Sequence, residues 1–271
     1  MKRIHLIVFL LILIVIPTYV LANDSLRVDS VAAILLNADN GNVLYSKNSG
    51  RIMAPASTTK IMTAILAIEQ TDLKSEVTIS GNAANKPETS MHLHKGEQLL
   101  MKDLLYGLLL SSGNDAATAI AEFISGSEER FAKLMTEKAH EIGMKDTEFK
   151  NASGLPAANH YTTAYDLAVL ARYALKNPVF AEIVQTKTAS ITDNQNDFNL
   201  TNHNKLLWKY QFATGIKTGY TRKAGNCLVA SANCNGINLI AVVLKSNNTY
   251  QDSIKLFENG FNKLINNNNK S

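Results

Sequence analysis

The sequence predicts an α/β protein in which a mostly helical middle is inserted between the strands of one sheet. Three observations indicate this fold class. Two short apolar runs flank a turn near the N-terminus, apolar residues follow a helical spacing through the middle, and three strand-like runs follow near the C-terminus. The 271 residues, 46% hydrophobic and 18% charged, are enough for a sizeable core. Because there is no internal repeat and no Gly/Ser-rich or Pro-rich linker, we expect a single discontinuous domain.

The first predicted elements after residue 30 are a hairpin and a helix. Residues 31–36 and 42–45 are apolar runs on either side of Asp39-Asn40-Gly41, which has the turn chemistry of a hairpin. Residues 57–70 carry isoleucines at helical spacing, and Pro55 lies just before them, as at many helix starts. The chain therefore opens with two strands and a helix.

Helical spacing dominates residues 102–182, and strands return after it. The predicted helices span residues 104–110, 116–124, 129–142 and 164–176, the last of which ends before Pro178. After a polar stretch at 193–204, three consecutive antiparallel strands are predicted at 213–218, 227–232 and 237–244. A final apolar stripe from Ile254 to Ile265 fits an interfacial membrane helix or a helix packed on the sheet, and its mixed flanking charges favour packing.

The first 22 residues have the pattern of a secretory signal peptide. Lys2 and Arg3 precede an unbroken apolar run at 6–16, then Pro17 and a small-residue pattern that ends at Ala22. A membrane anchor is the alternative, but a spanning helix needs about 20 apolar residues and Pro17 ends this run early. We therefore expect cleavage after Ala22, a mature chain of residues 23–271 and a secreted, extracytoplasmic protein with no transmembrane span after the signal.

Charge, cysteines and histidines limit the function classes. A net charge of +4 is too small for a nucleic-acid-binding surface. Cys227 and Cys234 are the only cysteines; on one strand they would lie about 20 Å apart, beyond the reach of a disulfide, so we expect two buried thiols. His92 and His94 have no partners at zinc spacing, so no metal is expected.

The first candidate for chemistry is Ser57-Thr58-Thr59-Lys60 at the start of a predicted helix. Residues three apart share a helix face, so the Lys60 amine can reach the Ser57 hydroxyl and act as its base. The helix N-terminus also favours negative charge that develops at Ser57. Taken alone, the pattern equally fits a capping serine and a solvated lysine.

Two further short segments follow in the chain. Ser112-Gly113-Asn114 lies between two predicted helices, where a loop can aim both polar side chains at a cleft, although a plain helix-capping turn is the alternative. Lys217-Thr218-Gly219 ends a predicted strand. On an edge strand it offers a cation, a hydroxyl and a close backbone approach to a peptide that ends in a carboxylate; the alternative is an ordinary strand end.

The three segments in this order resemble the serine-type D-Ala-D-Ala carboxypeptidases, which are low-molecular-mass penicillin-binding proteins. The resemblance runs from about residue 31 to residue 261. The matching segments are 54–64 (APASTTKIMTA), 103–109 (DLLYGLL), 112–117 (SGNDAA), 151–155 (NASGL), 160–168 (HYTTAYDLA), 203–207 (HNKLL) and 217–221 (KTGYT). It implies the penicillin-recognising serine DD-peptidase/β-lactamase-like fold, an antiparallel five-stranded sheet flanked by helices with an inserted all-helical subdomain at about 80–185. Many members continue into a β-rich second domain and a membrane anchor, whereas this chain stops after its last predicted helix.

The resemblance also implies a mechanism and partners. Ser57 is expected to attack the carbonyl between two D-alanines of a peptidoglycan stem peptide, with Lys60 as the base, and to form an acyl-enzyme that water cleaves. Lys60 must then be a neutral amine, which burial and the nearby charge of Lys217 would favour. Ser112 is expected to relay a proton to the leaving amine, and Asn114 to hold the substrate or Lys60.

The remaining expected site residues bind the substrate. Lys217 and Thr218 are expected to bind the terminal carboxylate, Gly219 to allow close approach, and the backbone amides of Ser57 and Tyr220 to form the oxyanion hole. The expected partners are peptidoglycan stem peptides, with β-lactam antibiotics as covalent inhibitors. No cofactor is expected, and the implied location is the cell-wall side of the bacterial membrane.

Two other functions are compatible with such a fold. A class A β-lactamase needs an added glutamate to activate water, but residues 151–178 contain no Glu-x-x-Leu-Asn-like segment and Ser-Gly-Asn replaces Ser-Asp-Asn. A penicillin-acylated sensor or wall-binding module without turnover would need membrane helices to transmit a signal, and no such helix is predicted after residue 22. The carboxypeptidase hypothesis is therefore favoured.

Overall fold

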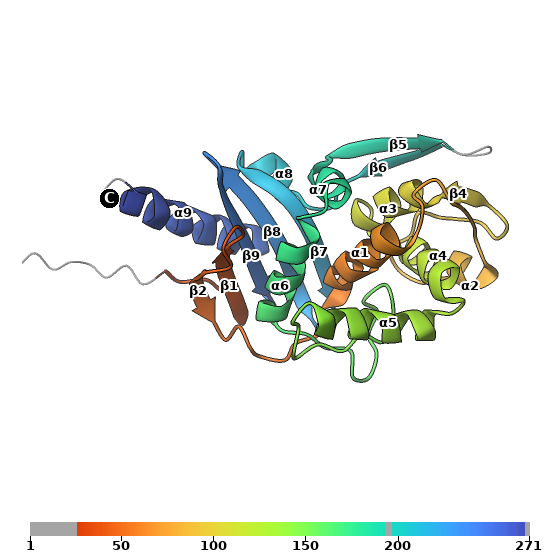
Figure 1. The fold of residues 1–271 in the computed structure, drawn as a ribbon, viewed down its shortest axis with the longest axis horizontal. Helices are drawn as coiled ribbons and strands as arrows, with labels where there is room; N and C mark the ends of the chain where they lie inside the picture. The colour runs from red at the N-terminus through yellow and green to blue at the C-terminus, as the bar shows by residue number, and fades with distance from the viewer. Residues whose placement is uncertain (1–25, 193–196, 269–271) are drawn as a thin grey trace, which may run out of the picture.

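A five-stranded antiparallel sheet forms the centre of the computed structural model, which describes residues 26–192 and 197–268 (Figure 1). The strand order is β2-β1-β9-β8-β7. The strands are β1 (Ala32–Asn37), β2 (Val43–Lys47), β7 (Ala213–Thr221), β8 (Gly225–Cys234) and β9 (Ile237–Leu244). The N-terminal hairpin therefore pairs with the three C-terminal strands, which confirms the predicted α/β class and the single sheet built from both ends of the chain.

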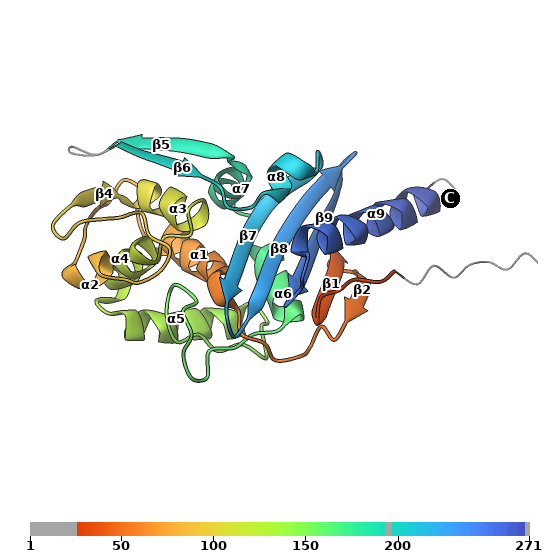
Figure 2. The same ribbon diagram turned by 180° about the vertical axis from the view of Figure 1, so that it is seen from behind.

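Both faces of the sheet are covered, which explains why its central strands are almost continuously apolar. Along β9, Ile240 and Val242 face the larger core shared with the helical part, whereas Leu239 and Ala241 face a second core. The second core is closed by α9 (Thr249–Asn268), and α6 (Ala164–Ala174) packs on the opposite face. Figures 1 and 2 show these two helices on opposite sides of the sheet. The prediction that the last helix packs on the sheet is confirmed.

The helical part is built around α1 (Lys60–Gln70). This helix contacts α6 and four other helices, α3, α4, α5 and α7, whose bounds are given below. Residues 60–67 are fully enclosed, since α1 lies between the sheet and the outer helices (Figure 1). The other elements here are β3 (Glu76–Thr78), α2 (Gly81–Ala84), β4 (Gln98–Leu100), α3 (Met101–Leu109), α4 (Asn114–Ser125) and α5 (Glu128–Glu141). The short β3–β4 pair was not predicted, because two three-residue strands carry little periodicity.

Three further features differ from the predictions by more than the position of an end residue. The predicted helix at 57–70 begins with a 3₁₀ turn, η1 (Ala56–Thr59), before α1 starts. Pro178 was predicted only to follow a helix end, but it is also the first residue of another helix, α7 (Pro178–Gln185). Proline is tolerated there because the first N–H of a helix has no partner within the helix. The Asn177 side chain caps this helix by accepting hydrogen bonds from two backbone amides. The polar stretch at 193–204, for which no strand was predicted, contains the strand β6 (Asp197–Thr201). This strand forms a hairpin with β5 (Thr188–Thr192), which lies just before the stretch.

The cysteines lie on one strand, as predicted. Cys227 and Cys234 stand at opposite ends of β8, and both are free. The expectation of two buried thiols is correct for Cys227 and wrong for Cys234, which is half-buried because it lies at the end of the strand. The predicted signal peptide lies outside the described residues. Within residues 26–192 and 197–268, no helix combines the length and hydropathy needed to cross a bilayer.

Phe257 tests how far the sheet depends on α9. Its ring is fully buried, 5.9 Å from the Tyr210 ring and 6.4 Å from the Phe261 ring. Replacing a buried phenylalanine by alanine leaves a cavity, so we expect Phe257→Ala to lower the free energy of unfolding by about 3–5 kcal/mol in denaturant titrations. Phe123→Ala is the control, since that ring is 44% exposed. Equal losses in the two variants would contradict the assigned packing of α9.

Candidate active site

The 3₁₀ turn η1 presents Ser57 at the N-terminal end of α1. Thr58 donates a 2.7 Å bond from its hydroxyl to the carbonyl of Pro55, which closes the turn. The preceding Ala56 has a left-handed backbone, with φ of 49°. The amino group of Lys60, the first residue of α1, lies 3.1 Å from the hydroxyl oxygen of Ser57. The predicted nucleophile and base are therefore in contact.

Lys60 is fully buried and its amine has three hydrogen-bond partners. It lies 2.7 Å from the side-chain oxygen of Asn114 and 2.7 Å from the carbonyl of Ser153, in addition to Ser57. A neutral amine donates two hydrogens and accepts one. These partners fit that form, because the first two oxygens only accept while the Ser57 hydroxyl can donate.

Electrostatics also favours the neutral amine. Burial is the main cause that lowers the pKa of Lys60 well below its ordinary value, and the charge of Lys217 lowers it further. Asp115 and Glu88 act in the opposite direction. The arrangement can therefore activate a serine hydroxyl at neutral pH, because the base need not first lose a proton.

Two further hydrogen bonds, from the side-chain nitrogen and the backbone N–H of Asn114, orient this residue. Its side-chain nitrogen donates a 2.8 Å bond to the carbonyl of Pro87, and its backbone N–H donates a 2.8 Å bond to the carbonyl of Thr89. These bonds turn the amide oxygen toward Lys60. Asn114 therefore contacts Lys60, one of the two roles that the sequence left open for it.

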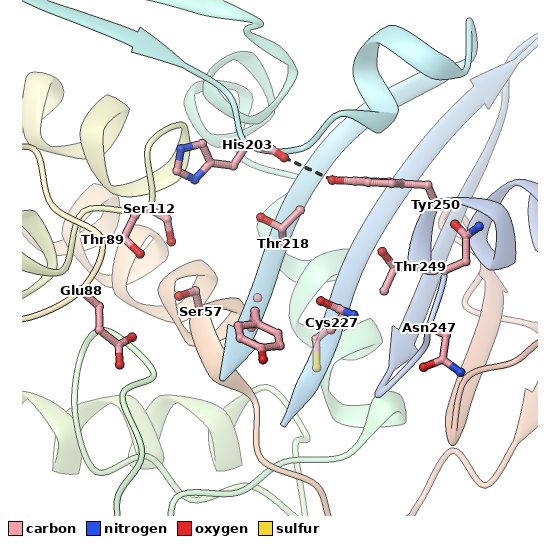
Figure 3. Close-up of a pocket in the computed structure, with 14 residues that line it drawn as sticks. Ser57, Glu88, Thr89, Ser112, His203, Thr218, Cys227, Asn247, Thr249 and Tyr250 are labelled. Carbon is pink, nitrogen blue, oxygen red and sulfur yellow. Dashed lines mark hydrogen bonds between the residues drawn. The ribbon is translucent and has the colours of Figure 1, made fainter. Parts of the chain in front are cut away.

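Ser112 lies between α3 and α4 with a left-handed backbone, φ of 64°, and it is only 5% exposed. This loop brings its side chain to the same cavity as Ser57 (Figure 3). Serine is an uncommon residue for that backbone conformation, and such outliers are frequent at functional sites.

Neighbouring residues of β7 divide between the two sides of the sheet. Thr218 and Tyr220 line the cavity, and Tyr220 is 62% exposed. Lys217 lies on the other face of β7, the face that Gly219 turns toward the Ser57 backbone, and is 1% exposed; its amine donates a 3.1 Å bond to the carbonyl of Thr218. Burial lowers the pKa of Lys217 to about 7. Lys217 is not one of the residues that line the cavity, and its charge acts on Lys60 and His203.

Gly219 and Gly154 are required by close backbone contacts around Ser57. A side chain at Gly219 would place its first carbon 3.0 Å from the Ser57 nitrogen. At Gly154, where φ is 88°, the same carbon would lie within 1.9 Å of the Ala56 carbonyl oxygen. The β7 backbone therefore approaches the Ser57 amide, as an oxyanion hole shared by Ser57 and Tyr220 requires.

The cavity that contains Ser57 has a volume of about 450 Å³ and is open to solvent (Figure 3). Hydroxyl and amide groups dominate its walls. The lining residues are Ser57, Glu88, Thr89, Ser112, His203, Thr218, Gly219, Tyr220, Asn226, Cys227, Asn247, Asn248, Thr249 and Tyr250. Over the described part of the chain, no group of three or more histidine, cysteine or acidic side chains is arranged to hold a metal ion.

Sequence reasoning missed several of these contacts. The Ser153 carbonyl and the His203 side chain lie in segments that carried the family resemblance, at 151–155 and 203–207, but nothing in either segment indicated its role. Burial lowers the pKa of His203, and the charge of Lys217 adds to this. Glu88 and Thr89 belong to a loop with no motif at all.

Comparisons with known proteins agree with this geometry. The D-alanyl-D-alanine carboxypeptidase family model matches residues 19–248. The chain is 40% identical to a Bacillus subtilis D-alanyl-D-alanine carboxypeptidase, DacF, over 90% of this chain and 66% of the relative, and 35% identical to Escherichia coli DacC over 90% and 65%. It therefore spans slightly less than two thirds of the length of these two relatives. DacB2 of Mycobacterium tuberculosis is 34% identical over 84% of this chain and 81% of its own length.

Solved structures show the same relationship. A D-alanyl-D-alanine carboxypeptidase from Mycobacterium tuberculosis superposes with a TM-score of 0.83 at 30% identity, over 87% of this chain and 92% of that structure. A Streptomyces DD-transpeptidase variant gives 0.82 at 31% identity, over 87% and 98%. These neighbours confirm the predicted penicillin-recognising fold. With its family match, its relatives and its fold in agreement, the chain belongs to the D-alanyl-D-alanine carboxypeptidase family of serine peptidases.

Proposed function

We propose that this protein is a serine-type D-alanyl-D-alanine carboxypeptidase that removes the terminal D-alanine from peptidoglycan stem pentapeptides. The observation that carries the proposal is the 3.1 Å contact between the Ser57 hydroxyl and a buried Lys60 amine whose pKa is lowered. The names of the relatives support the same substrate.

In the proposed first step, the Ser57 oxygen attacks the carbonyl carbon between the two D-alanines while Lys60 takes the hydroxyl proton. The negative charge on the carbonyl oxygen is stabilised by the backbone amides of Ser57 and Tyr220, a contribution of about 3 kcal/mol per donor. Ser112 then relays that proton from Lys60 to the leaving amine, so D-alanine departs and Lys60 is neutral again. Water attacks the resulting ester while Lys60 takes a proton from it, and that proton returns to the Ser57 oxygen as the ester bond breaks.

The terminal carboxylate is proposed to bind where the Thr218 hydroxyl and the positive charge of Lys217 act together. Thr218 offers a direct hydrogen bond from the cavity wall, and the buried Lys217 contributes positive charge. A β-lactam would acylate Ser57 in the same way, since its ring carbonyl and carboxylate present the same two groups. The leader pattern of residues 1–22 supports a proposed location outside the cytoplasm, at the cell wall.

Ser57→Ala tests the nucleophile. The purified protein is incubated with a fluorescent penicillin and, separately, with a pentapeptide ending in D-Ala-D-Ala. We expect the wild type to be labelled at Ser57, to clear the label slowly and to release D-alanine. Because the variant lacks the attacking oxygen, both reactions should fall at least about 1,000-fold. Ser190→Ala, an exposed serine on β5, is the control.

Three outcomes would contradict the proposal. Labelling that survives in Ser57→Ala would mean that another group is the nucleophile. Labelling without D-alanine release would indicate a sensor, and rapid clearance of the penicillin would indicate a β-lactamase.

The lowered pKa of Lys217 predicts how kcat/KM changes at alkaline pH. Its pKa of about 7 means that the amine is charged below pH 7 and loses its attraction for the substrate carboxylate above it. Lys60 titrates in the opposite sense, since it accepts a proton only when neutral. We therefore expect kcat/KM, which reports the free enzyme, to fall as pH rises through about 7.

Lys217→Arg should remove that fall, because a guanidinium stays charged throughout the range. Lys187→Arg should keep the wild-type profile, since Lys187 does not line the cavity and its amine lies over the Trp208 ring. An alkaline fall that is unchanged in Lys217→Arg would assign it to a different group.

A further inference from the structure

The cavity wall carries a single acidic side chain whose charge the proposed reaction does not use. Among the residues that the structure describes, Glu88 is the one carboxylate that lines the cavity, and no lysine or arginine lines it. Figure 3 shows Glu88 across the cavity from β7, beyond Ser112 and Thr89 in the direction in which β7 runs. A lone carboxylate on a polar, uncharged wall favours a cationic group in the ligand.

The backbone on both sides of Glu88 is fixed to the start of α4. The carbonyls of Pro87 and Thr89 each accept a 2.8 Å bond from Asn114. One residue further on, the Ser90 hydroxyl donates a 2.5 Å bond to Asp115. Residue 88 is thus held between anchored neighbours. Its φ of 68° is a conformation that glycine or asparagine would adopt at less cost, yet a long acidic side chain occupies it.

The proposed binding mode determines which part of a substrate passes this wall. If the terminal carboxylate lies at Thr218 and the scissile carbonyl lies between the amides of Ser57 and Tyr220, the peptide runs back along β7 from residue 218 toward residue 220 and beyond. An extended chain advances about 3.3 Å per residue. The residue that precedes the D-alanine pair therefore lies past Ser57, on the side where Glu88 faces the cavity.

We propose that Glu88 selects stem peptides in which the residue before the D-alanine pair carries a free side-chain amine. This inference rests on the proposed function and names the substrate class within it: peptides with a diamino acid whose second amine is neither acylated nor cross-linked. The ammonium group donates charge-assisted hydrogen bonds to the carboxylate, and substrate binding shields that contact from water. Because Glu88 is exposed in the free protein, the preference should be about two- to fivefold.

Two synthetic peptides separate this role from the reaction itself. Both are Nα-acetyl-L-lysyl-D-alanyl-D-alanine, one with a free ε-amine and one with that amine acetylated, and D-alanine release gives kcat/KM for each. The wild type should prefer the free amine about two- to fivefold. Glu88→Gln should bring the ratio of the two kcat/KM values close to one, and Glu88→Lys should reverse it. Glu129→Gln, an exposed glutamate on α5, is the matched control and should keep the wild-type ratio.

The ratio is the decisive readout because the charge of Glu88 also acts on Lys60. An effect through Lys60 changes both peptides equally and cancels in the ratio. A wild-type ratio near one, or a ratio that Glu88→Gln leaves unchanged, would overturn the inference while D-alanine release still supports the proposed function. Failure of the wild type to release D-alanine from either peptide would instead overturn the proposed function.

Discussion

The burial of the Lys60 amine is the constraint on which the rest of the site depends. An isolated ammonium group is costly in a protein interior, and within the described residues the ion pairs all involve other side chains. The protein lowers that cost by favouring the neutral amine and by surrounding it with two acceptors and one hydroxyl. These three partners come from η1, α4 and the segment at 151–154, so the packing of distant parts of the chain sets the chemistry of one nitrogen.

The sheet supplies the second half of this arrangement. β7 is an edge strand of the sheet, and it packs against α7 and η1. Glycine at residue 219 lets the two backbones approach to contact distance, and the alternation of side chains along β7 sends Lys217 inward while Thr218 faces the cavity. The second buried cation helps to keep Lys60 neutral. Binding and activation are thus coupled through charge.

Much of this could be predicted from the sequence where the information is local. The apolar run at 237–244 indicated a buried strand, and the three-residue spacing of Ser57 and Lys60 indicated their contact. Other features depend on tertiary structure. Ser153 acts through a backbone carbonyl, which any residue possesses, and Glu88 lies in a loop whose neighbouring residues are bonded to Asn114 and Asp115, far away in the sequence. The β5–β6 hairpin was missed because its exposed strands are largely polar. The burial of Lys217 was also missed, since a lysine on an edge strand is ordinarily solvated.

Asn114 joins two functions in one side chain. Its oxygen faces the Lys60 amine while its nitrogen holds the carbonyl of Pro87. A displacement of the loop around Glu88 would therefore pull on the carboxamide and disturb the amine behind it. Change in that loop is mechanically restricted for this reason: an insertion or deletion there must preserve the position of the Pro87 carbonyl, or Asn114 loses the hydrogen bond that orients its oxygen toward Lys60.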